Sequence, residues 1–127
     1  MKIYIATSWE NRGRAESWAK HVENSSMSIT YRWWEAPFAD ETWLSDEVKR
    51  ELAVQCLRGV ADADVVWILA PETGGQGVWV ELGYSLAKKK MIVYSGPDRT
   101  IFSKLPGVTG FTLHLEALQF LQKWRKV

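Results

Sequence analysis

Short apolar runs alternate along the chain with longer amphipathic stretches. The runs that predict β-strands are residues 2–7, 26–34, 64–71 and 91–96, with a short fifth strand at 108–113. Residues 64–71 are almost continuously apolar, which is typical of a central parallel strand buried on both faces. Residues 26–34 alternate between apolar and polar positions, which is the two-residue period of a half-exposed strand.

The stretches between these runs predict helices. Apolar positions recur at helical spacing in residues 11–22, 44–59 and 115–124. Gly59 is expected to end the second of these helices, since glycine is common just past a helix C-terminus. A further helix is expected from the glycine loop at 74–77 to residues 88–90, whose lysines suit the negative end of the helix dipole. Residues 35–44 have mixed polarity and predict a loop.

This alternation of elements predicts the fold class. Strands that alternate with helices at this spacing form right-handed βαβ units around a parallel sheet. We therefore expect one domain over residues 1–127, a small doubly wound α/β fold of the flavodoxin or Rossmann-like type, with four or five parallel strands and helices on both faces. Ligands in such sheets bind beyond the carboxyl ends of the strands, where the strand order reverses. That rule selects the segments at 7–14, 33–43 and 71–81.

The charge balance narrows the class of ligand. The 127 residues include 16 basic and 15 acidic side chains, which leaves a formal net charge of +1. This balance gives no strong field for a nucleic acid polymer or an anionic membrane, so a small molecule is the expected partner. The single cysteine, Cys56, cannot form an internal disulfide, and no metal site is predicted. No stretch approaches the length of a membrane span or a signal peptide, so a cytoplasmic location is expected.

Eight tryptophans are the unusual feature of the composition. Their flat faces suit either core packing or stacking on a nucleobase. Phe38 and Trp43, both in the predicted loop, would accordingly either line a ligand site or cover the core.

A glycine loop precedes the third helix within PETGGQGVWVELGYSLAKKK, residues 71–90. Gly74, Gly75 and Gly77 could allow backbone N–H groups and the helix dipole to face an anion such as a phosphate. The pattern lacks the Lys-Ser/Thr pair of a P-loop and the GxGxxG spacing of a dinucleotide site. Phosphate binding is therefore one of two interpretations of this stretch.

The second interpretation concerns Glu81, which is expected near the N-terminus of this helix. The helix dipole there should stabilise an ionised carboxylate, and an ionised carboxylate can attack a sugar carbon. An ordinary helix-start acid, or one half of a surface ion pair, would need no such role. No cation within the helix can pair with Glu81, because the positions one turn away are Gly77, Val78, Tyr84 and Ser85.

Several segments carry a resemblance to a known family. They are KIYIATSW, ADADVVWILAP, VELGYSLAKKKMIVYSG and IFSKLPGVTGF, which together cover most of the chain. In this order they resemble the nucleoside 2-deoxyribosyltransferase family, including its nucleotide N-glycosidase relatives. The resemblance implies that Glu81, the glutamate of the ELGY motif, attacks C1′ of the sugar and forms a glycosyl-enzyme. Water or a second base then releases the sugar.

The resemblance carries further implications for the whole molecule. The family has the doubly wound fold predicted above, and its chemistry requires no metal or redox cofactor. The substrate would be a small nucleoside or nucleotide. Because family members assemble with shared active sites, a homodimer or larger homo-oligomer is implied.

The resemblance also assigns roles to aromatic residues around Glu81. Tyr4 would hydrogen-bond to the nucleophile and orient it, although a buried strand aromatic would look the same in the sequence. Trp9 would stack on the base. Trp34 or Trp43 could share that role, and core packing is the alternative for both.

Residues after the first strand are candidates for binding the rest of the substrate. Thr7 ends that strand, within the segment selected by its place at the carboxyl edge of the sheet. Ser8, Arg12 and Arg14 lie where nucleotide-hydrolysing relatives bind the 5′-phosphate. Arginine suits phosphate through paired hydrogen bonds, and solvated surface arginines are the alternative.

Two departures from the family pattern affect the expected reaction. Cys56 and Gly75 stand where the family commonly has aspartates, and Cys56 lies on an apolar helix face, which favours a packed thiol. Without those acids, protonation of the leaving base is left to Asp62, Asp64 or Glu72. Hydrolysis of an N-glycosidic bond is therefore expected in preference to base transfer.

Two other functions fit the same residues. A nucleotide-binding sensor or partner module could keep the pocket and lack catalysis, and the missing acids favour it. Cleavage of NAD by a single glutamate, as in Toll/interleukin-receptor-type domains with a similar sheet, is a further alternative.

Overall fold

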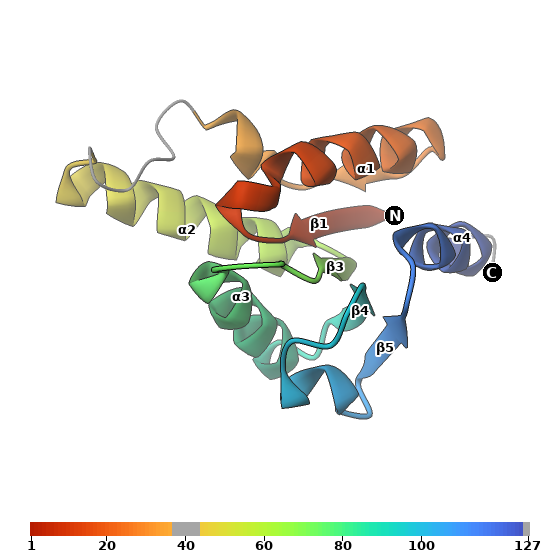
Figure 1. Cartoon of the computed structure of the whole chain (residues 1–127). Coiled ribbons are helices and arrows are strands. Elements are labelled where there is room, and N and C mark those ends of the chain that lie inside the picture. The colour runs from red at the N-terminus through yellow and green to blue at the C-terminus, as the bar shows by residue number, and fades with distance from the viewer. Residues whose placement is uncertain (37–43, 126–127) are drawn as a thin grey trace.

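The computed structural model describes residues 1–36 and 44–125 and folds them into one parallel sheet covered by helices (Figure 1). The strands of the described chain are β1 (Lys2–Ala6), β2 (Ser28–Ile29), β3 (Val65–Leu69), β4 (Met91–Ser95) and β5 (Val108–Phe111). They lie in the order β2-β1-β3-β4-β5, and every neighbouring pair is parallel. The strand order reverses between β1 and β3, so a ligand site is expected beyond their carboxyl ends.

Two helices cover each face of the sheet. One core cluster joins the sheet to α1 (Arg12–Asn24) and α4 (His114–Arg125), and the other joins it to α2 (Asp46–Asp62) and α3 (Gln76–Ala87) (Figure 1). Successive strand side chains point to opposite faces, so Ile3 and Ile5 enter the first cluster and Tyr4 enters the second. The predicted doubly wound fold is confirmed.

The segment at 26–34 forms a much shorter strand than predicted. Only Ser28 and Ile29 pair with β1, and Trp33–Glu35 form a short 3-10 helix, η2. The alternating pattern did not produce a longer strand, because the two tryptophans pack into the protein instead of lying on opposite faces of a strand. The Trp33 indole Nε1 donates a hydrogen bond to the Ile5 carbonyl at 2.7 Å, and Trp34 is buried in the core.

Gly59 does not end a helix, which corrects the sequence-based expectation. Helix α2 continues through it to Asp62. A Cβ on Gly59 would lie 2.8 Å from Cδ2 of Tyr4 and 2.9 Å from Cβ of Tyr31, closer than Cβ atoms tolerate. The glycine therefore allows the Tyr4 ring to pack directly against the α2 backbone.

Within residues 1–36 and 44–125, no helix combines the length and the apolar character needed to cross a membrane. The predicted loop residues Phe38 and Trp43 lie outside the described part of the chain.

The contact at Gly59 predicts the effect of a single methyl group. Gly59→Ala should lower the free energy of unfolding by about 1–2 kcal/mol, because the buried Tyr4 ring must shift to admit the Cβ. Urea denaturation measures this change. Gly83→Ala is the matched control, because a Cβ there meets nothing within 4 Å and alanine favours a helix interior by up to about 1 kcal/mol. A Gly59→Ala protein as stable as Gly83→Ala would contradict the packing argument.

Candidate active site

The glycine loop makes a tight entry into α3. Gly74 and Gly75 have φ angles of +65° and +86°, a region that side chains rarely adopt. A Cβ on Gly75 would also lie 2.8 Å from Cγ of Pro71. Gly77 differs, since it lies inside the first turn of the helix and a Cβ there would meet nothing within 4 Å. The first two glycines are therefore required by backbone geometry, whereas Gly77 is not.

Glu81 lies deeper in α3 than the sequence indicated. The helix begins at Gln76, so Glu81 falls beyond the first turn, where the helix dipole gives a carboxylate little stabilisation. The side chain is 8% exposed. Burial raises the pKa of Glu81 from 4.5 to about 7, and the hydrogen bond from Tyr4 opposes that rise. The expected dipole-stabilised carboxylate is thus corrected to a buried group that titrates near neutral pH.

Tyr4 and Glu81 meet across the space between β1 and α3. The Tyr4 hydroxyl donates a hydrogen bond to Oε2 of Glu81 although the residues are 77 positions apart in the sequence. Burial and the nearby carboxylate hold the pKa of Tyr4 well above 10, so its hydroxyl remains a donor. Among the described residues, no hydrogen bond is made to the other oxygen, Oε1. Within the described chain, Tyr4 therefore holds one oxygen of the carboxylate.

Cys56 on α2 borders this pair. Its half-buried thiol interacts with the Tyr4 hydroxyl and with the charge of Glu81. Burial, and then the Glu81 carboxylate, raise the pKa of Cys56 to about 11. The thiol therefore stays protonated at neutral pH and has the character of a packed group rather than a reactive one.

The segment after β1 supplies the next group of predicted residues. Thr7 is buried and its hydroxyl accepts a hydrogen bond from Asn11 Nδ2 at 3.1 Å. Ser8 is 3% exposed, and its Oγ has no hydrogen-bond partner within the described chain. The Arg12 guanidinium lies over the Trp9 ring, 4.3 Å from its centroid, and its Nη1 donates to the Trp9 carbonyl at 3.1 Å. Arg12, which was predicted to bind phosphate, thus covers one face of Trp9, which was predicted to stack on the base.

The segment after β1 and the glycine loop face each other. Arg14 Nη2 and Glu72 Oε1 form an ion pair at 3.1 Å between them. Glu10, in the 3-10 helix η1 (Trp9–Asn11), also faces the loop, because a Cβ on Gly74 would lie 3.4 Å from its Oε2. Sequence reasoning did not single out Glu10. Its place within the segment at 7–14 was the available signal, but its approach to Gly74 depends on tertiary structure.

The sequence matches no protein-family model and no curated protein. The fold, however, matches solved enzymes. The CMP N-glycosidase BcmB of Clostridium botulinum superposes with a TM-score of 0.63 and 14% sequence identity, over 98% of this chain and 99% of that one. The 2-deoxyribosyltransferase of Bacillus psychrosaccharolyticus superposes with a TM-score of 0.61 and 19% identity, over 80% of this chain and 76% of that one. The chain has the nucleoside 2-deoxyribosyltransferase fold. The resemblance drawn from the sequence is confirmed at this level.

Trp34 lies apart from Glu81 in this deoxyribosyltransferase fold. It is 7% exposed and belongs to the core cluster beneath α1 and α4, whereas Tyr4 belongs to the cluster beneath α2 and α3. Its Nε1 has no hydrogen-bond partner among the described residues. The structure thus gives Trp34 the core environment that was its alternative interpretation.

The candidate proton donors also separate. Asp64 accepts a hydrogen bond from the Lys2 backbone N–H at 2.8 Å, at the amino end of the sheet, and Asp62 ends α2 close by in the chain. Glu72 alone among the three lies in the glycine loop after β3. In the described part of the chain, no group of three or more His, Cys, Asp or Glu side chains could hold a metal ion.

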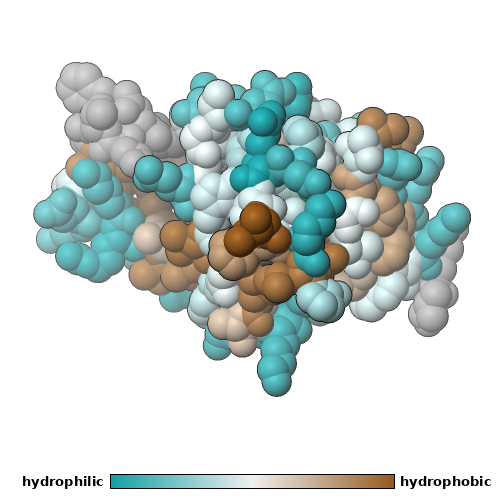
Figure 2. Space-filling model, turned by 60° about the horizontal axis from the view of Figure 1, so that its bottom comes forward, coloured by the Kyte–Doolittle hydropathy of each residue, from teal (hydrophilic) through white to brown (hydrophobic). Residues whose placement is uncertain are grey.

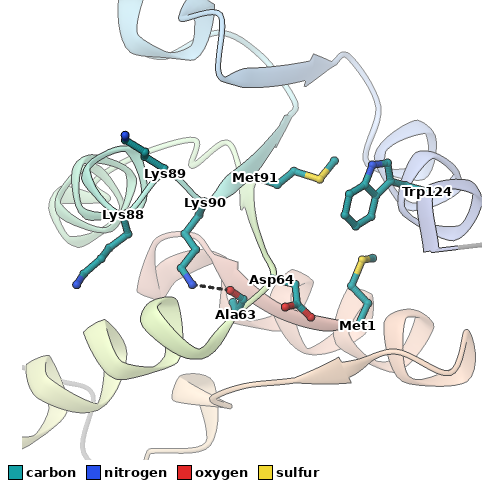
Figure 3. A pocket seen from close by; sticks show the side chains of 8 residues that line it. All are labelled: Met1, Ala63, Asp64, Lys88, Lys89, Lys90, Met91 and Trp124. Carbon is teal, nitrogen blue, oxygen red and sulfur yellow. Dashed lines mark hydrogen bonds between the residues drawn. The ribbon is translucent and has the colours of Figure 1, made fainter. Parts of the chain in front are cut away.

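A pocket of about 640 Å³ lies at the amino ends of β1, β3 and β4 (Figure 3). The glycine loop follows β3 and so lies beyond the opposite, carboxyl ends. The lining of the pocket includes Met1, Asp64, Lys90, Met91 and Trp124. The Lys90 ammonium donates hydrogen bonds to the carbonyls of Ala61 and Ala63 at 2.6 and 2.9 Å, so it caps the C-terminal end of α2. Because ligands of such sheets bind at the carboxyl ends, the Tyr4–Glu81 pair remains the candidate site.

The raised pKa of Glu81 predicts a pH-dependent stability. A carboxyl group whose pKa rises from 4.5 to about 7 on folding contributes its full stability below pH 4.5 and loses it as the pH rises through 7. The loss should reach about 3 kcal/mol. Glu81→Gln removes this titrating group. The free energy of unfolding of the variant minus that of the unmodified chain should therefore be larger at pH 8.5 than at pH 5.

Urea denaturation at the two pH values measures this difference. Glu16→Gln, on the exposed side of α1, is the control and should show almost none. An equal effect of Glu81→Gln at both pH values would contradict a carboxyl group that is buried and titrates near 7.

Proposed function

We propose that this chain is an N-glycosidase that cleaves the N-glycosidic bond of a deoxynucleoside or deoxynucleoside 5′-monophosphate, with Glu81 as the nucleophile. The observation that carries the proposal is the buried Glu81 carboxylate held by the Tyr4 hydroxyl. The deoxyribosyltransferase fold, shared with an N-glycosidase and a transferase, supports this reaction class.

The geometry fits a two-step displacement. Oε1 of ionised Glu81 would form a bond to C1′ of the sugar while the base leaves with the electron pair of the broken C–N bond and takes up a proton. Tyr4 would act as the positioning residue, because its hydrogen bond fixes Oε2. Water would then attack C1′, give its proton to solvent or to the departing carboxylate, and release the free sugar and Glu81.

Of the three candidates for protonating the base, only Glu72 lies in the glycine loop, and its carboxylate is paired with Arg14. The leaving base would therefore take its proton from water. Hydrolysis needs only water as the acceptor of the sugar, so it places fewer demands on this site than transfer to a second base. We propose hydrolysis for that reason.

We also propose that the chain forms a homodimer or larger homo-oligomer. Apolar side chains gather on the underside of the molecule, over α3 and the 3-10 segment Ile101–Lys104 (Figure 2). The exposed apolar residues of these elements are Val80, Ile101 and Phe102. Contiguous apolar surface of this kind favours association with another copy.

One observation favours the alternative of a binding module without catalysis. Cys56, which borders the Tyr4–Glu81 pair, holds a thiol that stays protonated and cannot replace an ionised aspartate. A protein that binds the nucleotide without cleaving it could also have a cysteine at this position.

Release of free base tests the proposal. Deoxynucleosides, their 5′-monophosphates and NAD are incubated with the unmodified chain and with Glu81→Ala, and base is followed by chromatography. Glu81→Ala should lower the rate at least about a thousandfold, because no other described carboxylate bonds to Tyr4. The rate of the unmodified chain should rise as the pH passes through about 7, where Glu81 ionises. Glu16→Ala should retain full activity.

Other outcomes would decide against it. If no substrate releases base but one raises the melting temperature of both proteins, the chain is a binding module. Release of nicotinamide from NAD alone would identify an NAD glycohydrolase.

A further inference from the structure

The glycine loop already has a carboxylate of the protein beside it. Gly74 and Gly75, with successive positive φ angles, lead into the N-terminus of α3. Such a loop is the usual place for a bound phosphate. Here the two oxygens of Glu10 lie 3.4 and 3.7 Å from the position of a Cβ on Gly74. A phosphate in this loop would have to share the space with that carboxylate.

The two arginines predicted to bind phosphate are engaged by the chain itself. Arg14 pairs with Glu72 at 3.1 Å, and Arg12 stacks over Trp9 and donates to its carbonyl. The two positive charges of Arg12 and Arg14 are matched by the two negative charges of Glu10 and Glu72. By this count the edge of the site is electrically neutral, whereas an excess of positive charge strengthens the binding of a phosphate.

A neutral hydroxyl group suits these surroundings better than a phosphate. It can donate a hydrogen bond to Glu10, and a charged acceptor makes such a bond stronger. A phosphate monoester is mainly a dianion at neutral pH, so it has little proton to donate and would be repelled by both carboxylates. Ser8 does not decide between them, because its hydroxyl can donate to a phosphate or accept from a sugar hydroxyl.

We propose that the glycine loop receives the unphosphorylated 5′ end of a nucleoside, so that Glu10 and Glu72 select nucleosides against nucleoside 5′-monophosphates. This inference rests on the proposed function and names its substrate class. It separates this chain from the CMP N-glycosidase that shares its fold. Discrimination arises from repulsion of the wrong substrate as well as from attraction of the right one.

Binding measurements test the inference without relying on turnover. Calorimetry is done on Glu81→Gln with each of the four common 2′-deoxynucleosides and with its 5′-monophosphate. At least one nucleoside should bind about tenfold more tightly than its monophosphate, and the difference should shrink as salt is added. Glu10→Gln, combined with Glu81→Gln, should weaken the nucleoside and strengthen the monophosphate.

Glu72→Gln gives an independent test, because it releases Arg14 for the phosphate. Combined with Glu81→Gln, it should strengthen binding of the monophosphate severalfold. Glu16→Gln is the matched control on α1 and should leave the ratio of affinities unchanged. Glu10, Glu72 and Glu16 are all exposed, so none of these changes threatens the fold.

The inference is overturned if the monophosphate binds as tightly as its nucleoside or more tightly, if neither binds, or if Glu10→Gln and Glu72→Gln change the ratio no more than Glu16→Gln does. Failure of the proposed function would be distinct. In that case a nucleoside would bind with the predicted pattern, but the chain with Glu81 intact would release no base from it.

Discussion

The hydrogen bond between Tyr4 and Glu81 is the constraint on which the rest of the site depends. It joins the middle of β1 to α3, so the strand order, the entry of α3 and the approach of α2 must all be correct for it to form. Gly59 admits the tyrosine ring against α2, and Gly75 admits the turn over Pro71 that begins α3. Gly59 and Gly75, which the sequence suggested were a helix end and a loop residue, are thus positions of close tertiary contact.

Burying this carboxylate opposes folding and changes the pH at which it ionises. A group moved out of water resists ionisation, which raises the pKa of Glu81 to about 7. Tyr4 offsets part of the cost by donating to the ionised form, while its own burial keeps its proton in place. The surrounding apolar core, with β3 buried along its full length, supplies the stability that tolerates such a group.

The fold could be predicted because it follows from apolar periodicity, which a sequence displays directly. The buried run of β3 and the stepped apolar faces of α2 and α4 are examples. Prediction failed where a tertiary contact overrode the local pattern. Trp33 and Trp34 turned a would-be strand into η2, and the Tyr4 ring gave Gly59 a place inside α2.

The candidate site was predictable in part for the same reason. Its segments follow from the strand order, and the meeting of Tyr4 with Glu81 agrees with the family resemblance. The burial of Glu81 and the approach of Glu10 to Gly74 depend on side chains brought together from distant elements. The roles assigned to these residues stay predictions until they are tested by chemistry.

Covalent trapping is the most direct test of the claim that Glu81 is the nucleophile. A nucleoside with fluorine at C2′ slows hydrolysis of a glycosyl-enzyme, so the intermediate accumulates and peptide mass spectrometry can locate it. We expect the sugar on the peptide that contains Glu81, and no adduct on the Glu81→Ala variant. Base release from natural substrate together with no adduct, or with an adduct on another residue, would contradict it.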